Sequence, residues 1–137
     1  MRAQVKAAAQ VYFGCSSLQG AEVENQPTGS CQIMGSHWEQ RIFMNSVMAS
    51  TLQPDGGLLN PVTLALFEDS GWYKANYSMA ASFKYRVDWG FNQGCDFALN
   101  KCLALPAPYS TGDPAHYCTD ASGDRTCTVN RYFQQQL

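Results

Sequence analysis

The sequence predicts a helix-rich, irregular fold of the α+β class. Two segments, 2–13 and 60–71, carry the apolar spacing and the end signals of amphipathic helices. The rest of the chain is rich in Gly, Ser, Pro and aromatic residues and contains six cysteines. A chain of 137 residues is long enough to bury a hydrophobic core. We therefore expect a few helices joined by long irregular segments and tied by disulfides.

The first helix is predicted over residues 2–13, where ordinary helical packing explains the pattern. Apolar side chains recur on one helix face: Val5, Ala8, Ala9, Tyr12 and Phe13. Gly14 follows as a stop signal. No N-cap residue precedes the pattern, which is typical of a chain cut within a helix. Segment 15–36 is a predicted loop, with Gln-Pro-Thr-Gly-Ser at 26–30, and it leads to His37.

The second helix is predicted after a turn signal at 54–57. Asn60 is its expected N-cap, Pro61 its first helical residue and Gly71 its stop signal. The expected apolar face consists of Val62, Ala65, Leu66 and Phe67. Glu68 and Asp69 fall in the last turn, where the helix dipole disfavours anions. A solvated face is the preferred interpretation, and a fixed hydrogen bond is the alternative.

Aromatic residues are dense between residues 72 and 97. Packing in a core is favoured over carbohydrate stacking, because aromatic side chains dominate core burial. Residues 87–89 suggest a short strand, and Gly90 and Gly94 bound an irregular loop. The last 35 residues are poor in aliphatic side chains, so they need cross-links or a partner to fold.

The charge balance excludes some classes of function. The net charge is −2 with 15% charged residues and no basic run, so nucleic acid is not an expected partner. Neither an apolar run of 18 residues nor the apolar region of a signal peptide is present. Six cysteines and the glycosylation sequon at Asn76 nevertheless indicate a secreted protein. The conflict is resolved if the sequence is a fragment of a longer exported protein.

The segment from Gly35 to Met48 is the candidate for chemistry. It contains His37, one of two histidines in the chain. A continuous helix would hold His37 and Met48 about 16 Å apart. If Met48 lies beneath a metal bound by His37, the chain must turn back between them, as in the Met-turn of metzincin peptidases.

The motif Gly-Ser-His-Trp-Glu-Gln-Arg at 35–41, followed by Met48, resembles the leishmanolysin family. These are the surface zinc metallopeptidases of trypanosomatid parasites. The resemblance covers most of the chain. It continues through Val-Tyr-Phe-Gly-Cys (11–15), Leu-Phe-Glu-Asp-Ser-Gly-Trp-Tyr (66–73), Trp-Gly-Phe-Asn-Gln-Gly-Cys-Asp-Phe (89–97) and Asn-Lys-Cys (100–102).

The resemblance implies a division at residue 102. Residues 1–102 would form the metzincin-type C-terminal catalytic subdomain with its Met-turn, and residues 103–137 the start of a truncated, disulfide-tied Cys-rich domain. It implies that His37 is the third zinc ligand and that Met48, with Met44 as runner-up, forms the base under the metal. The implied substrate pocket contains Ala49, Ser50 and Thr51, for each of which a surface connection between helices is the alternative. The implied disulfide joins Cys15 to Cys95, while Cys31, Cys102, Cys118 and Cys127 have no assigned partners.

The sequence contains no H-E-x-x-H motif, which in metzincins supplies two zinc ligands and the general base. We therefore expect these groups on a missing N-terminal part, and no peptidase activity from this chain alone. Asn45 and Ser46 replace acidic residues that are common in the family. The resemblance further implies peptide substrates, a cell-surface or extracellular location, a link to adhesion, and membrane contact only through a glycolipid anchor, whose signal this sequence does not show.

Two other functions are open on the sequence. A non-catalytic cysteine-rich adhesion or binding module is favoured if the parent gene never encodes H-E-x-x-H. A structural zinc site is the other possibility, although its spacing is irregular and lacks a C-x-x-C pair. Its ligands would be Cys102, His116, Cys118 and Cys127.

Overall fold

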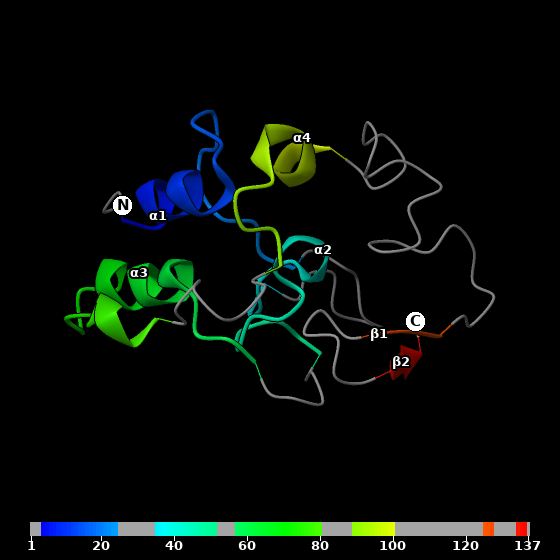
Figure 1. Ribbon diagram of the computed structural model, residues 1–137. Helices are drawn as coiled ribbons and strands as arrows, with labels where there is room; N and C mark the ends of the chain where they lie inside the picture. The colour runs from blue at the N-terminus through cyan, green and yellow to red at the C-terminus, as the bar shows by residue number, and fades with distance from the viewer. Residues whose placement is uncertain are drawn as a thin grey trace.

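The computed structural model describes residues 4–24, 35–51, 57–80 and 89–100, and the backbone of two short strands. The helices are α1 (Gln4–Phe13), α2 (Gln40–Phe43), α3 (Pro61–Asp69) and α4 (Gly94–Leu99), with a 3₁₀ helix η1 (Tyr77–Met79). The strands β1 (Arg125–Cys127) and β2 (Gln134–Gln136) pair antiparallel, with Arg125 opposite Gln136. Within the described part, the expected helix-rich character with few strands is confirmed (Figure 1).

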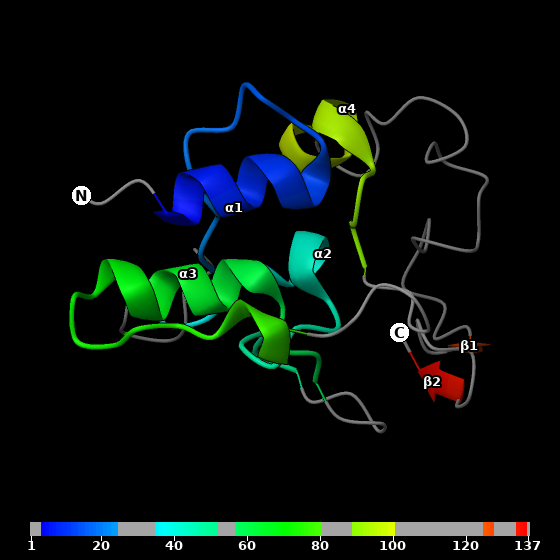
Figure 2. The ribbon, with the colours of Figure 1, turned by 60° about the vertical axis from the view of Figure 1, so that its left-hand side comes forward.

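Helices α1 and α3 lie side by side and antiparallel (Figures 1 and 2). Asp69, the last residue of α3, accepts hydrogen bonds from the backbone N–H groups of Gln4 (3.3 Å) and Val5 (2.9 Å). These N–H groups open α1 and have no partner within that helix, so Asp69 satisfies them from another element. For Asp69, the alternative interpretation of a fixed hydrogen bond is therefore confirmed. The preferred interpretation of a solvated face is wrong there.

Helix α1 begins and ends close to its predicted limits. Its C-terminus is closed by two backbone bonds, from Gly14 to Val11 (3.3 Å) and from Cys15 to Gln10 (2.9 Å), with Gly14 at φ +67°. This is the Schellman arrangement that a glycine after a helix favours. The predicted apolar stripe faces the core, where Ala9, Tyr12 and Phe13 are buried.

Helix α3 also follows its sequence signals, with one exception. The Asn60 side chain accepts the N–H of Thr63 at 2.9 Å, and Gly71 has φ +78°. Phe67, expected on the apolar face, is 45% exposed. At about 100° per residue it lies about 140° around the helix from buried Val62, so both cannot face α1. Phe67 instead contacts the ring of Tyr73, with ring centroids 5.4 Å apart.

The core is built mainly from aromatic rings of elements far apart in the sequence. Phe43 of α2 contacts Phe13 of α1 at a centroid distance of 5.1 Å and stacks on Trp38 at 5.4 Å. Buried Trp89 and Phe97 join the same cluster. Core packing of the aromatic-rich segment is thus confirmed for these two residues but not for its exposed aromatics: Trp72, Tyr73 and Tyr77.

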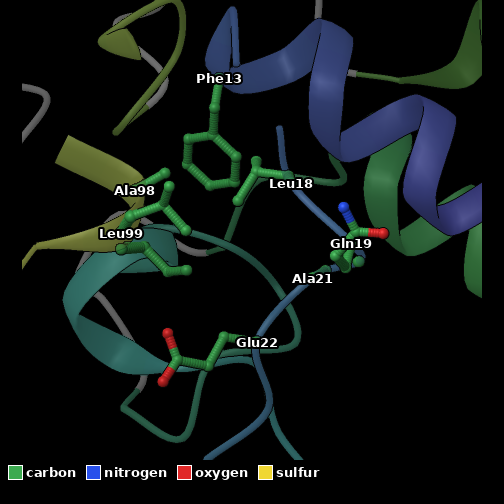
Figure 3. A pocket seen from close by; sticks show the side chains of 9 residues that line it. Phe13, Leu18, Gln19, Ala21, Glu22, Ala98 and Leu99 are labelled. Atoms are coloured by element: carbon green, nitrogen blue, oxygen red, sulfur yellow. The ribbon is translucent and has the colours of Figure 1, made fainter. Parts of the chain in front are cut away.

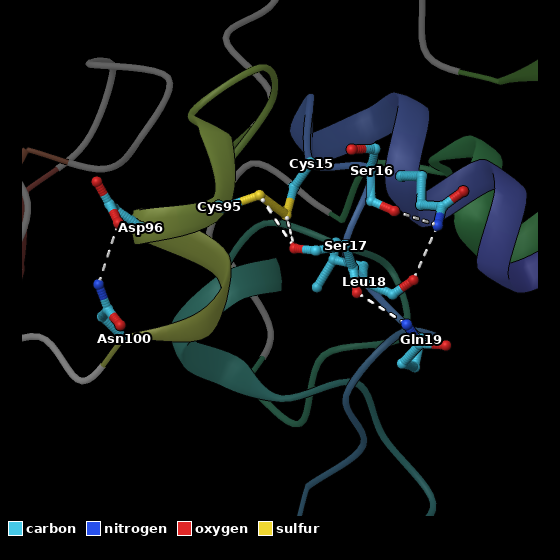
Figure 4. The surroundings of a disulfide bond; sticks show 9 residues. Cys15, Ser16, Ser17, Leu18, Gln19, Cys95, Asp96 and Asn100 are labelled. Atoms are coloured by element: carbon cyan, nitrogen blue, oxygen red, sulfur yellow. Dashed lines mark hydrogen bonds between the residues drawn. A yellow bond between two sulfur atoms is a disulfide. The ribbon is translucent and has the colours of Figure 1, made fainter.

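The disulfide between Cys15 and Cys95 is present, and its Cα–Cα distance of 4.8 Å lies within the range that is usual for disulfides. It joins the end of α1 to α4 (Figure 4). The sequence did not predict α4, which is only six residues long and begins at Gly94.

Several predictions fall outside the described residues. These are the loop at 26–30, residues 54–56 of the turn at 54–57, the strand residues Val87 and Asp88, and the division at residue 102. Trp89, the last residue of that expected strand, lies in a turn, and Gly90 beside it has φ +80°. Among the helices of the described ranges, none has the length and apolar character needed to cross a membrane.

Candidate metal centre

The chain turns back on itself between His37 and Met48, so that the segment after the turn runs beside and parallel to the segment that carries His37. Helix α2 spans only Gln40–Phe43, and a turn follows in which the N–H of Ser46 bonds to Phe43 O at 2.8 Å. The N–H of Trp38 then reaches the carbonyl of Met48 at 3.0 Å, and Trp38 forms a parallel bridge with Ala49. His37 directly precedes Trp38, and Met48 directly precedes Ala49. The backbones of residues 37 and 48 therefore also lie side by side, about 5 Å apart. The expectation that the chain turns back between His37 and Met48 is confirmed.

Trp38 fixes the position of its neighbour His37. Its side chain is buried, and its indole N–H donates to Thr63 Oγ1 at 2.9 Å. The Thr63 hydroxyl in turn donates to Asn60 Oδ1 at 3.0 Å. Because Asn60 caps α3, the segment that carries His37 is attached to the start of that helix.

Arg41 attaches the same segment to α4. Its guanidinium donates to the carbonyls of Phe97 (2.7 Å) and Ala98 (3.0 Å) in the last turn of that helix. A cation at this end satisfies free carbonyls and complements the helix dipole. The Trp89 indole N–H donates to Arg41 O at 2.8 Å, and Glu22 Oε2 lies 3.8 Å from the guanidinium.

The side chain of His37 is partly exposed, at 38%, and its Nδ1 lies 3.1 Å from Glu24 Oε2. The two backbones are also paired, since the N–H of Glu24 donates to His37 O at 2.9 Å beside a Val23–Trp38 antiparallel bridge. Sequence reasoning did not single out Glu24, because a lone acidic residue thirteen positions before a histidine carries no periodic signal.

The turn itself is held by Asn45 and Ser46, the two residues that the resemblance implies stand in place of acidic ones. Asn45 is buried and its Oδ1 accepts the N–H of Trp89 at 3.1 Å. Ser46 is buried and its Oγ accepts the N–H of Met48 at 3.2 Å. Each bond needs only an acceptor oxygen, which an amide or a hydroxyl provides as well as a carboxylate. The two substitutions are therefore compatible with the turn.

The other expected site residues lie in or near the turn between His37 and Met48. Met44 and Met48 are both half-buried and pack against the core cluster. Ala49 is buried, whereas Ser50 and Thr51 are exposed. Asn76 is exposed, and its Oδ1 accepts from the N–H (3.1 Å) and the hydroxyl (2.7 Å) of Ser78 in the same sequon.

A pocket of about 260 Å³ lies elsewhere, between the end of α1, residues 18–22 and α4 (Figure 3). Its lining is mostly apolar and includes Phe13, Leu18, Ile42 and Ala98, with Glu22 at its edge. Neither His37 nor residues 49–51 contribute to it. We therefore do not associate this pocket with the expected site.

The described residues supply one candidate ligand rather than a complete site. In those ranges no group of three His, Cys, Asp or Glu side chains is placed to hold a metal ion. Of the rival structural zinc site, Cys102, His116 and Cys118 lie outside the described residues, and only the backbone of Cys127 is described. A partly exposed imidazole such as that of His37 can serve as one ligand among others.

The partly exposed His37 lies within the motif Gly-Ser-His-Trp-Glu, on a chain that turns back to Met48. These features fit the metallopeptidase class of proteins. The sequence model of the leishmanolysin peptidases, peptidase family M8, matches residues 1–135. The chain belongs to this family of zinc metallopeptidases.

The similar proteins include animal as well as parasite members. A leishmanolysin-like peptidase of Drosophila pseudoobscura is 42% identical over 133 residues, which are 93% of this chain and 18% of that protein. A leishmanolysin-like peptidase of Caenorhabditis elegans is 36% identical over 97% of this chain and 20% of its own length. Leishmanolysin of Leishmania major is 33% identical over 91% of this chain and 19% of its own length. The chain spans about a fifth of the length of these relatives.

Proposed function

We propose that this chain supplies the third zinc ligand and the Met-turn of a leishmanolysin-type zinc endopeptidase. The observation that carries the proposal is the turn back of the chain, in which the Trp38 N–H donates to the Met48 carbonyl and residues 37 and 48 become neighbours. This supports Met48 rather than Met44 as the residue beneath the metal.

In this proposal His37, Ser46 and Met48 have one task each. His37 contributes an imidazole nitrogen, and Met48 provides an apolar base under the ion. Ser46 holds the Met48 backbone through its 3.2 Å hydrogen bond. When bound, zinc acts as a Lewis acid towards water and the peptide carbonyl. Two further ligands and a general base come from an H-E-x-x-H helix on another part of the protein.

The proposed substrates are peptides and proteins. Exposed Ser50 and Thr51, with the backbone of buried Ala49, lie just beyond the turn and would line the pocket for the residue after the scissile bond. The proposed partner is the part of the peptidase that bears H-E-x-x-H, and no nucleic acid is involved. We place the protein at the cell surface or outside the cell, with membrane contact only through an anchor.

The chain alone should not cleave peptides. One imidazole cannot hold a catalytic zinc, and no Glu of an H-E-x-x-H motif is available as a base. Purified residues 1–137 should therefore show no chelator-sensitive hydrolysis of a peptide, with or without added zinc.

Activity should appear when the chain is co-expressed with a part bearing H-E-x-x-H from a relative. His37→Ala should then abolish activity, whereas His116→Ala, which removes the other histidine, should leave it unchanged. Hydrolysis by residues 1–137 alone, or full activity in the complemented His37→Ala variant, would contradict the proposal.

A non-catalytic adhesion or binding module is the alternative. It is favoured by the exposed aromatic side chains after α3, among them Trp72 at 85% exposure. Binding of the chain to a surface glycan or protein, lost on Trp72→Ala and unaffected by His37→Ala, would support this alternative.

A further inference from the structure

The carboxylate of Glu24 is the unexplained feature beside the candidate ligand. Its side chain is only 6% exposed, and its partner among the described residues is Nδ1 of His37 at 3.1 Å. Burial of a carboxylate is costly unless it accepts hydrogen bonds. The backbone pairing between residues 24 and 37 does not require an acid, because it uses only N–H and C=O groups. A carboxylate at this position therefore needs another reason.

The geometry determines the roles of the two ring nitrogens. An ionised carboxylate can only accept, so Nδ1 must carry a proton and donate to Glu24 Oε2. In a neutral imidazole the proton on Nδ1 leaves Nε2 with its lone pair. Across the described ranges, the hydrogen bond of the His37 side chain is the one to Glu24, so Nε2 is not used by the fold.

We propose that Glu24 is a positioning residue that holds His37 in the Nδ1–H tautomer and presents Nε2 to a metal ion. A carboxylate that accepts the other ring N–H of a metal-ligating histidine fixes its tautomer and orientation and raises its basicity. Glu24 is prepared for this task before any metal binds, because its backbone is paired with that of His37. The metal-binding part of this inference rests on the proposed function, whereas the tautomer does not.

The first test measures the tautomer by two-bond nitrogen–proton NMR spectra of the imidazoles in the full 137-residue chain. The spectra are recorded at mildly alkaline pH, and His116→Ala assigns the two histidines. Wild-type His37 should show the Nδ1–H pattern. Glu24→Met has nearly the same volume without an acceptor, so it should change His37 to the Nε2–H form that free histidine prefers. Glu24→Gln retains an acceptor oxygen and should keep the wild-type pattern.

Glu22→Met is the matched control, because it removes an exposed carboxylate two residues away that lies near Arg41 instead. It should leave the His37 tautomer unchanged. Wild-type His37 in the Nε2–H form, or an unchanged tautomer in Glu24→Met, would overturn the inference. Indole resonances of Trp38 report whether each variant is folded, and Glu24→Gln keeps the comparison informative if Glu24→Met unfolds.

The second test titrates zinc onto the same proteins, each co-expressed with a part bearing H-E-x-x-H, and follows the His37 ring resonances. Zinc should perturb Nε2, and Glu24→Met should weaken this binding about tenfold or more. Glu22→Met should weaken it less than twofold. Equal affinities for wild type and Glu24→Met, or zinc bound through Nδ1, would overturn the inference. If the tautomer behaves as expected but zinc does not perturb His37, the positioning by Glu24 holds and the proposed zinc site fails.

Discussion

At the scale of single residues, the position of His37 is set by its neighbours. Trp38 donates to Thr63 at the start of α3, and Arg41 donates to the end of α4. These side chains explain why tryptophan and arginine follow the histidine, since each makes a contact that shorter or apolar residues cannot make. The motif therefore combines one chemical residue with structural anchors.

Gly90 is a residue whose substitution should be severe. It has φ +80°, and a Cβ there would lie 2.8 Å from a Phe13 ring carbon and 2.9 Å from Ile42 O. Gly90→Ala should reduce the free energy of unfolding by about 2–5 kcal/mol. Denaturant unfolding measures this loss.

Two other glycines separate backbone strain from steric overlap. Gly94 has φ +83°, but a Cβ there would have no atom within 4 Å. Gly94→Ala should therefore reduce the free energy of unfolding by only about 1 kcal/mol. Gly20 is equally open and its φ is not positive, so Gly20→Ala should change stability by less than about 0.5 kcal/mol. Equal losses for Gly90→Ala and Gly94→Ala would show that overlap with the core is unimportant.

Tyr77 provides a pH-dependent prediction. Partial burial of the hydroxyl, and then its 2.8 Å hydrogen bond to Glu68, raise the pKa of Tyr77 from 10.0 to about 12. Because folding favours the protonated phenol, this contribution to stability is complete below pH 10 and is lost as the pH rises through about 12.

The phenolate absorbance, taken as the difference between wild type and Tyr77→Phe, measures this pKa. Glu68→Gln should lower the pKa of Tyr77 only part of the way towards 10.0, because burial is the larger cause. Glu22→Gln, which removes a distant carboxylate, should leave it unchanged. A return to 10.0 in Glu68→Gln would show that the hydrogen bond is the dominant cause.

At the scale of elements, helices with complete local signals could be predicted from sequence. The stripe of α1 and its Gly14 stop, and the Asn60 cap of α3, act within a few residues, so the sequence reveals them. Helix α4 could not be predicted in this way, because it is short and depends on the disulfide at Cys95 and on the Arg41 guanidinium. Phe67 was misplaced because four apolar positions were assigned to one face without following the helical angle.

The contact between Asp69 and the start of α1 should contribute to stability as an N-cap does. Asp69→Ala should lower the free energy of unfolding by about 1 kcal/mol and speed hydrogen exchange at the Val5 amide. Asp69→Asn keeps an acceptor oxygen, so its loss in the free energy of unfolding should be less than half of that of Asp69→Ala. Lys74→Ala, at an exposed position beyond α3, is the control and should have no effect. Unchanged exchange at Val5 in Asp69→Ala would exclude the capping role.

At the scale of the whole molecule, the contacts that assemble the candidate site join segments far apart in the sequence. Arg41 and Phe97 are 56 residues apart, and Asn45 and Trp89 are 44 apart. Such pairs have no periodic signature. The family resemblance implied the role of His37 and the turn back to Met48, but neither it nor the residue patterns predicted the scaffold around them. The family resemblance supplied the Cys15–Cys95 pairing, which spacing could not.

That disulfide should contribute strongly to the stability of the molecule. It closes a loop with a sequence separation of 80 residues, and in the chain-entropy model such a loop gives about 4.5 kcal/mol. Cys15 is buried within the core cluster, so the link also fixes α4 beside the end of α1. The double variant Cys15→Ala/Cys95→Ala should therefore lose about 3–5 kcal/mol in denaturant unfolding.

Reduction tests whether the Cys15–Cys95 bond, rather than bonds formed by the other four cysteines, accounts for the stability. If the Cys15–Cys95 bond dominates, a reductant should destabilise the wild type by about as much as the double substitution, and should have little effect on the double variant. Loss of the bond should also release Arg41 from the carbonyls of Phe97 and Ala98, because α4 would no longer be held beside it. The His37 ring resonances should then broaden in both the reduced and the substituted protein. Sharp, unshifted His37 resonances after reduction would show that the candidate metal ligand is positioned without the disulfide.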